Sequence, residues 1–297
     1  MCERGDRQPM GLSLKKSSFL LIALGLLGTG GILGCSTPTF EESSSEEISS
    51  PNSDETGVFS YEPYAELLQT YVDENGMVDY QSLQQNRQGL DQFNASIGAV
   101  SSATYESWSD NQKIAFLINA YNSFTLQSII DQNPIKDSIR DIPGVWRIRT
   151  FEIAGESKTL DNIEHQTLRK DFNEPRIHAA LNCTALSCPP LRPEPYVADQ
   201  LDQQLDEQVE QWLSSSYGVQ IDREAAEVKI SEIFDWFGED WLADYGVESG
   251  FAGSDKERAA LNFMTQYLEP EDAAYLEAGD YQVKYLDYDW SLNQKSS

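Results

Sequence analysis

Apolar residues recur at helical spacing along several stretches of the chain, and these stretches predict most of its secondary structure. Residues 61–72 and 83–97 each place apolar side chains three or four positions apart, which predicts two amphipathic helices. Residues 110–130 are apolar around most of the helical circumference. We therefore expect a long helix there, capped by Asp110 and buried on nearly all sides.

The remainder of the pattern mixes short strands with further helices. Residues 146–153 alternate polar and apolar side chains before an Ala-Gly-Glu turn, which predicts a strand and a hairpin. Further expected elements are a helix capped by Asp161 (162–172), a short apolar strand (176–182), a helix (197–213), a hairpin across Arg223-Glu224, two helices (231–236 and 256–267) and a closing strand (282–287). These elements predict an α+β fold: a helix-rich single domain with a small, mostly antiparallel sheet.

The N-terminal part has the organisation of a secreted lipoprotein. Residues 1–34 contain four basic residues followed by an uncharged run over residues 19–34, as in a secretory signal peptide. The run ends Ile-Leu-Gly-Cys, which resembles the bacterial lipobox, so we expect lipidation at Cys35; an ordinary signal peptide with a chance cysteine is the alternative. Residues 35–60 are rich in Ser and Glu and predict a solvated tether, followed by a globular domain over residues 61–290.

Charge and composition restrict the partners. The chain has 49 acidic and 21 basic residues and a formal charge of -28, which argues against nucleic acid as a partner. Membrane attachment is therefore expected through lipid at Cys35. The expected location is the cell envelope or periplasm, and the expected substrate is an envelope peptide or a small molecule. The globular part has no phosphate loop, G-x-S-x-G elbow or dinucleotide fingerprint, so no cofactor is expected.

Both histidines of the chain and both cysteines of the globular part fall between residues 165 and 188. Three interpretations of this cluster remain open. Cys183 and Cys188 could form a disulfide, since four intervening residues permit the required approach and the expected compartment is oxidising. A structural zinc site could use His165, His178, Cys183 and Cys188, although the spacing of these residues is not diagnostic.

The third interpretation is a catalytic thiol. If residues 176–183 are extended, His178 and Cys183 point to opposite sides of the strand. This favours His165 as the base for Cys183, with Glu164 or Asn119 orienting the imidazole. His178 is the alternative base if the chain bends before Cys183. Asn119 or Asn122 could also donate to an oxyanion.

Four motifs follow one another along the chain: AFLINAYN (115–122), TLDNIEHQTLR (159–169), RIHAALNCTALSCPPL (176–191) and YLDYDWSLN (285–293). Together they resemble the family called domain of unknown function 547, well over residues 108–213 and more loosely beyond. The family name supplies no reaction. The resemblance implies that these segments form one functional or structural core, with Asn119, His165, His178 and Cys183 at motif positions.

The content of Cys, His and Asn leads us to relate this core to papain-like and transglutaminase-like thiol enzymes. We therefore expect a membrane-anchored extracytoplasmic lipoprotein that acts as a thiol-dependent hydrolase or acyl transferase on an amide or ester. The alternatives are a non-catalytic binding or scaffold lipoprotein, with a Cys183–Cys188 disulfide stapling a loop, and a structural zinc protein.

Overall fold

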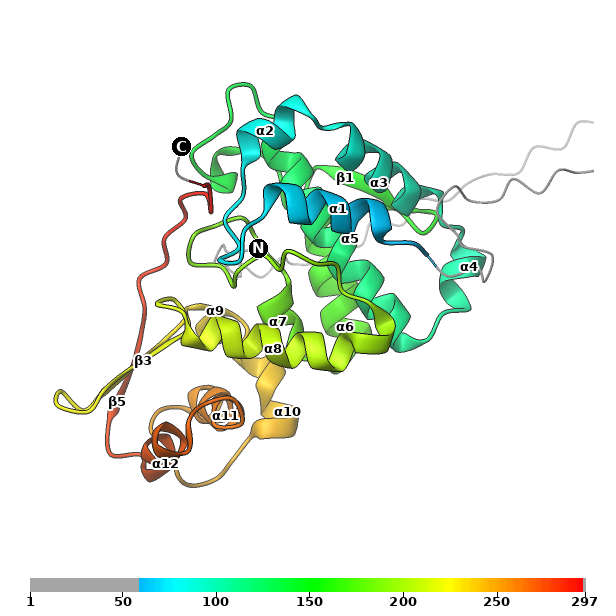
Figure 1. Ribbon diagram of the computed structural model, residues 1–297. Coiled ribbons are helices and arrows are strands. Elements are labelled where there is room, and N and C mark those ends of the chain that lie inside the picture. Colours follow the sequence, from blue (N-terminus) through cyan, green and yellow to red (C-terminus); the bar gives the residue numbers. More distant parts are fainter. Residues whose placement is uncertain (1–58, 296–297) are drawn as a thin grey trace, which may run out of the picture. The chain divides into compact units, whose positions relative to one another are not determined.

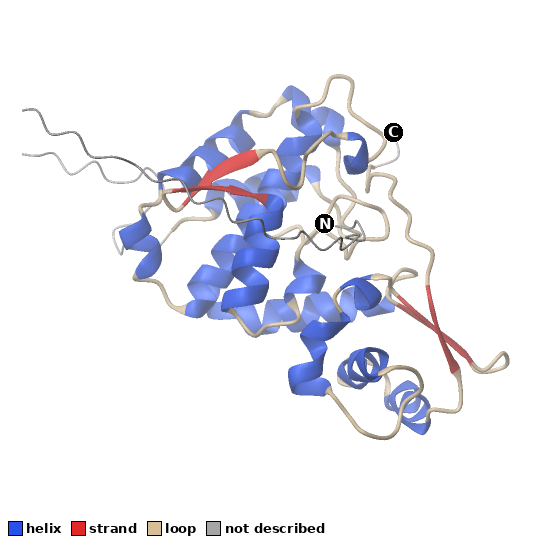
Figure 2. Ribbon diagram, turned by 180° about the vertical axis from the view of Figure 1, so that it is seen from behind, coloured by secondary structure: helices blue, strands red, loops and turns tan. Residues whose placement is uncertain are grey.

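The computed structural model describes residues 59–295, so the expected signal peptide, Cys35 and nearly all of the tether lie outside the described residues. Helices dominate, together with one two-stranded and one three-stranded sheet among the described residues (Figures 1 and 2). This confirms the α+β prediction, although the strands are divided between two sheets instead of one. Across residues 59–295, none of the helices combines the length and apolarity that a membrane crossing requires.

The first part of the fold surrounds one central helix. Helices α1 (Glu62–Tyr71), α2 (Tyr80–Gln85), α3 (Gln88–Ala99) and α4 (Ser102–Glu106) precede α5 (Asp110–Ile130). The single helix expected over residues 83–97 is interrupted, because Asn86 leaves helical geometry between α2 and α3. Leu83, Leu90 and Ile97 are nevertheless fully buried, so both helices turn their apolar faces inward.

Helix α5 is buried as its sequence predicts. Every residue from Ile114 to Ile130 is buried, including its polar residues. The cap is Ser109, however, and not Asp110: the Ser109 hydroxyl accepts from the Gln112 N–H while the Gln112 side chain accepts from the Ser109 N–H. This reciprocal capping box satisfies two backbone groups and starts the helix one residue earlier than expected.

A hairpin and an unusual helix follow α5. After the short 3₁₀ turn η1 (Ile139–Asp141), strands β1 (Thr150–Ile153) and β2 (Glu156–Thr159) pair antiparallel, which confirms the expected hairpin. Residues Asn162–Leu168 then form a π-helix, η2, which continues into α6 (Arg169–Asp171). Asp161 makes no capping bond with its side chain and instead lies 3.3 Å from the Arg147 guanidinium.

The strand expected at residues 176–182 is wrong: Ile177–Ala180 form the short helix α7. Pro175 and Arg176 lie at the start of this turn, and their carbonyl oxygens accept from the N–H groups of His178 and Ala179. A run as short as IHAA has no periodicity to separate strand from helix, so the sequence pattern could not decide between them. The 3₁₀ turn η3 (Ala198–Gln200) and helix α8 (Leu201–Ser214) come next, close to the expected helix.

The last part contains the second sheet and five short helical segments. Strands β3 (Val219–Asp222) and β4 (Glu227–Ile230) pair antiparallel as expected, and β5 (Gln282–Tyr285) joins β4 in parallel. Between β4 and β5 lie α9 (Ile233–Trp236), η4 (Gly238–Trp241), α10 (Leu242–Tyr245), α11 (Asp255–Met264) and α12 (Pro270–Ala278). Beyond β5, the C-terminal segment runs back towards α2 (Figure 1), where Lys295 N–H donates to the Val78 carbonyl.

Two clusters of buried apolar side chains hold these parts together. The α5 cluster contains the buried apolar side chains of α1, α2, α3 and α5 and the segment that carries Cys183. The α11 cluster contains Trp212, Trp241 and Phe263. Helix α7 belongs to both, because Ile177 and Ala180 pack in the α5 cluster while Ala179 packs in the α11 cluster.

Candidate functional site

A small cavity lies where α7 joins the two clusters. Its volume is about 20 Å³, which is room for about one water-sized group. Its lining residues come from α5, η2, α7, the cysteine loop, α9 and the C-terminal segment: Tyr121, Glu164, His178, Leu181, Cys183, Cys188, Ile233, Phe237 and Tyr288. The cavity therefore brings together four of the residues singled out in the sequence, Glu164, His178, Cys183 and Cys188. Neither His165 nor Asn119 lines it.

His178 is fixed from two sides. Its Nε2 lies 2.7 Å from Asp240 Oδ2, and its ring stacks on Phe237 with centroids 4.5 Å apart. Trp241 contacts the same ring at a centroid distance of 5.1 Å. These contacts all come from the segment around η4, so the imidazole is held in one orientation by a single neighbouring element.

Asp240 is in turn held by Arg169. The guanidinium contacts both carboxylate oxygens, with Nε 2.6 Å from Oδ2 and Nη2 2.8 Å from Oδ1. Burial opposes ionisation of Asp240, but the hydrogen bonds from His178 and Arg169 hold its pKa well below the ordinary value. A carboxylate can only accept, so we assign a hydrogen to His178 Nε2; in the neutral imidazole, Nδ1 is then the basic nitrogen.

The π-helix η2 places Glu164 and His165 differently. Glu164 lines the cavity and its Oε2 accepts a hydrogen bond of 3.0 Å from the Tyr121 hydroxyl. His165 is engaged by Arg169, whose Nη1 lies 2.8 Å from Nδ1, and its Nε2 is 3.8 Å from Glu164 Oε1. Burial, together with the Arg169 charge, holds the pKa of His165 below its ordinary value. π-Helical turns are rare and occur often at functional sites.

Cys183 lies at a strained turn. Thr184, the next residue, has φ of +63°, a left-handed conformation that is unfavourable for a β-branched residue. The Asn182 side chain supports the turn by accepting from the Thr184 N–H at 2.8 Å. The Cys183 sulfur lies 3.3 Å from the Tyr288 hydroxyl, which comes from the C-terminal segment.

Cys183 and Cys188 are not joined to each other in the structure. The Cys188 sulfur accepts from the Cys183 N–H at 2.9 Å and lies 3.7 Å from the Leu181 carbonyl oxygen. Both side chains are buried. Both cysteines line the cavity, and Cys188 in addition stabilises the backbone of the loop through these hydrogen bonds.

The two asparagines of α5 bind backbone segments. Asn119 donates to the Tyr196 carbonyl at 2.8 Å and accepts from the Tyr196 N–H at 3.0 Å. Asn122 makes the same pair of contacts with the Ala180 carbonyl and the Asn182 N–H, at 2.9 and 2.8 Å. The structure thus places Asn119 away from both imidazoles, and Asn122 holds the segment between His178 and Cys183 in position.

The four zinc-ligand candidates are not assembled as a ligand set. Among residues 59–295, no three or more His, Cys, Asp or Glu side chains form a group that could hold a metal ion. The His165 and His178 rings both lie beside Phe237, at centroid distances of 5.8 and 4.5 Å. Each imidazole is bonded to its own charged partner, Arg169 or Asp240.

Sequence reasoning missed several residues of this site, above all Asp240. Asp240 is one of 49 acidic residues and stands in an aromatic-rich stretch, FDWFGEDW, that predicts core packing. Tyr121 and Tyr288 carried a usable signal, because each falls inside one of the four motifs.

One comparison with known proteins bears on this region. Residues 105–213 match the family described as "Protein of unknown function, DUF547". No curated protein and no solved structure matches the chain. The matched region contains Tyr121, Glu164, His178 and Cys183 of the cavity lining, whereas Asp240 and Tyr288 lie beyond it.

Proposed function

We propose that the protein is a lipid-anchored extracytoplasmic thiol enzyme that hydrolyses or transfers the acyl group of an amide or ester. Cys183 is the nucleophile and His178 is its base. The observation that carries the proposal is the shared cavity: Cys183 and His178 line it together, and the Asp240 carboxylate holds the far side of the imidazole at 2.7 Å.

This assignment replaces the base favoured by the sequence pattern. The expectation for His165 rested on an extended segment that would send His178 and Cys183 to opposite sides. Helix α7 removes that objection, and His165 is bonded to Arg169, whose positive charge disfavours protonation of the ring. A base must gain a proton during the reaction, and the Asp240 carboxylate stabilises the resulting charge on His178.

The reaction runs in two balanced steps. In the first step, His178 Nδ1 takes the thiol proton as the Cys183 sulfur attacks the carbonyl carbon of the substrate. The bond between this carbon and the leaving nitrogen or oxygen then breaks, and the imidazolium gives its proton to the leaving atom. In the second, His178 takes a proton from water or an acceptor alcohol or amine, which attacks the thioester. The acyl group leaves as acid, ester or amide, and the thiol is restored with the proton from His178.

Other cavity residues support these steps. The Tyr288 hydroxyl, 3.3 Å from the Cys183 sulfur, is placed to donate to the oxygen that becomes negative when the carbonyl is attacked. Glu164, fixed by Tyr121, lines the same cavity and can orient the second nucleophile. A cavity of about 20 Å³ has room for the reacting group alone, so the rest of a substrate remains outside it.

The experiment uses the natively secreted protein and 4-nitrophenyl acetate as an acyl donor. Intact and peptide mass spectrometry should find an acetyl adduct on Cys183 in the wild type and in Cys188→Ser, but not in Cys183→Ala. His178→Gln should slow acylation by on the order of a hundredfold, because the general base is lost, whereas His165→Gln should change it only a few fold. The amide that His178→Gln introduces can still donate to Asp240, which limits the structural damage.

Two results would contradict the proposal. Equal slowing by His178→Gln and His165→Gln would remove the distinction between the two histidines. A wild-type protein in which Cys183 and Cys188 are quantitatively joined and resist mild reductant would leave no nucleophile and would favour the non-catalytic binding or scaffold lipoprotein instead.

A further inference from the structure

A second, much larger cavity lies between α1, the start of α5 and η3. Its volume is about 480 Å³, within the range of small-molecule sites. Its walls are mainly apolar and aromatic, with a few polar side chains: Phe59, Tyr61, Glu62, Ala65, Trp108, Gln112, Ala115, Pro195, Val197, Ala198, Asp199 and Gln200. None of these residues lines the Cys183 cavity, so the two sites are separate.

Three aromatic rings form one side of this cavity. Phe59 packs edge-on against Tyr61 and Trp108, with centroid distances of 5.1 and 6.4 Å. Phe116, a buried residue of α5, contacts both Phe59 and Trp108 at 5.2 and 5.0 Å. The aromatic wall is therefore anchored in the core and is formed before any ligand arrives.

The opposite wall is also held in place. Asn119 binds the backbone of Tyr196. Gln204 of α8 binds the two residues next to Tyr196: its amide donates to the Pro195 carbonyl at 2.9 Å and accepts from the Val197 N–H at 2.8 Å. The backbone of residues 195–197, of which Pro195 and Val197 line the cavity, is thus fixed by two buried amides. A rigid wall lowers the conformational entropy that binding would cost.

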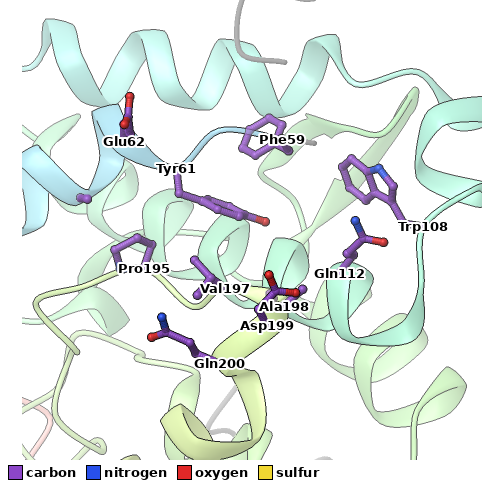
Figure 3. A pocket seen from close by; sticks show the side chains of 12 residues that line it. Phe59, Tyr61, Glu62, Trp108, Gln112, Pro195, Val197, Ala198, Asp199 and Gln200 are labelled. Atoms are coloured by element: carbon purple, nitrogen blue, oxygen red, sulfur yellow. The ribbon is translucent and has the colours of Figure 1, made fainter. Parts of the chain in front are cut away.

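The charged side chains that line this cavity are all acidic. Glu62 and Asp199 are the charged residues among the lining side chains, and Lys, Arg and His do not occur there. Figure 3 shows the Asp199 carboxylate and the Gln112 amide directed towards the space beside the Tyr61 ring, while Glu62 lies on the other side of Tyr61. Lys113, next to Gln112 in the chain, lies over the Tyr105 ring instead, 5.6 Å from its centroid.

We propose that this cavity binds a small organic cation with an apolar body, such as an aryl- or alkylammonium. The apolar part fills the space between Ala65, Ala115 and Val197, and the ammonium group lies between the aromatic rings and Asp199. Aromatic faces attract cations through their quadrupole, and a carboxylate adds a direct charge interaction. A carboxylate or phosphate ligand would meet only repulsion from Asp199 and Glu62.

The test compares three probes with the same apolar body and different head groups. Isothermal titration calorimetry of the secreted protein with 4-phenylbutylammonium, 4-phenylbutanol and 4-phenylbutyrate should give the tightest binding for the ammonium and the weakest for the carboxylate. Asp199→Asn should weaken ammonium binding about three- to fivefold and leave the alcohol unchanged, because Asp199 is exposed and its charge is screened.

Two further variants control for the site and for charge. Ala198→Phe fills the cavity from a half-buried position and should abolish binding of both the ammonium and the alcohol. Glu210→Gln removes one exposed negative charge outside the cavity and should change neither. Equal affinities for the three probes, the absence of saturable binding, or unchanged binding in Ala198→Phe would each overturn the proposal.

Discussion

Asp240 is the residue that joins the charged side chains of the Cys183 site, because it accepts hydrogen bonds from both His178 and Arg169. Asp240→Asn keeps the shape of the side chain but removes the carboxylate that contacts Arg169 twice. The Arg169 side chain is only 17% exposed, and Glu239 Oε1, 3.7 Å from its Nη2, is then its remaining carboxylate partner. We expect a loss of about 2–3 kcal/mol in the free energy of unfolding at pH 7, measured by urea denaturation. Asp235→Asn, an exposed change in α9, is the matched control and should be nearly neutral.

The same variant predicts a pH dependence with a definite sign. The pKa of Asp240 is lower in the folded protein than in the unfolded chain, so its contribution to stability is present above the unfolded value of about 4 and is lost as the pH falls towards the folded value. The difference between wild type and Asp240→Asn should therefore shrink below about pH 4. A difference that grows as the pH falls would mean that Asp240 is not the depressed carboxyl.

Among the elements, the C-terminal segment after β5 has the most direct effect on the Cys183 site. It places the Tyr288 hydroxyl 3.3 Å from the Cys183 sulfur. It also forms backbone hydrogen bonds with the loop that carries Cys183 and Cys188, in which the Leu186 N–H donates to the Ser291 carbonyl at 2.7 Å. Asn293 holds the end of this segment in place, because the Asn293 side chain accepts from the Tyr80 hydroxyl at 2.6 Å and donates to the Gly76 carbonyl at 2.9 Å.

Asn293→Ala should release this segment. Two buried hydrogen bonds are lost and the Tyr80 hydroxyl is left without its acceptor, so we expect a cost of about 2–3 kcal/mol. Because local opening would uncover the buried thiol, iodoacetamide should also modify Cys183 several fold faster than in the wild type. Gln294→Ala, a change at the neighbouring residue, is the control; equal rates in all three proteins would show that the segment does not cover the thiol.

The elements also show what the sequence pattern can and cannot predict. The long helix over residues 110–130 and the two hairpins follow from periodicity and turn residues, because their signals are local. Helix α7 is too short to show a period, and the parallel pairing of β5 with β4 depends on chain packing. The partnership of Asp240 with His178 spans 62 residues, and no local signal marks one acidic side chain among 49.

For the whole molecule, the net charge bears on the proposed lipid anchor. Removal of residues 1–34 would take away four basic and two acidic residues and leave a formal charge of -30. A chain of this charge is repelled by an anionic membrane surface. On the proposed function, acyl chains at Cys35 would supply the attachment, at about 0.8 kcal/mol per buried CH₂.

The anchor is tested by intact mass spectrometry of the full-length protein expressed in a bacterial host with lipoprotein processing. The wild type should begin at Cys35 and carry added acyl mass. Cys2→Ser changes a cysteine within the segment expected to be removed and should give the same mass, whereas Cys35→Ser should carry no acyl group. A wild-type chain of unmodified mass would refute the lipoprotein assignment.

The position of helix α7 between the two apolar clusters also sets when a reactive thiol can appear. Cys183 packs in the α5 cluster, while Phe237 and Trp241, which hold the His178 ring, pack in the α11 cluster. Neither cluster contains the complete arrangement, and Asp240 is synthesised well after His178. On the proposed function, a nascent or translocating chain carries an ordinary cysteine, and the enzyme becomes active only when its last segments have folded in the compartment where it works.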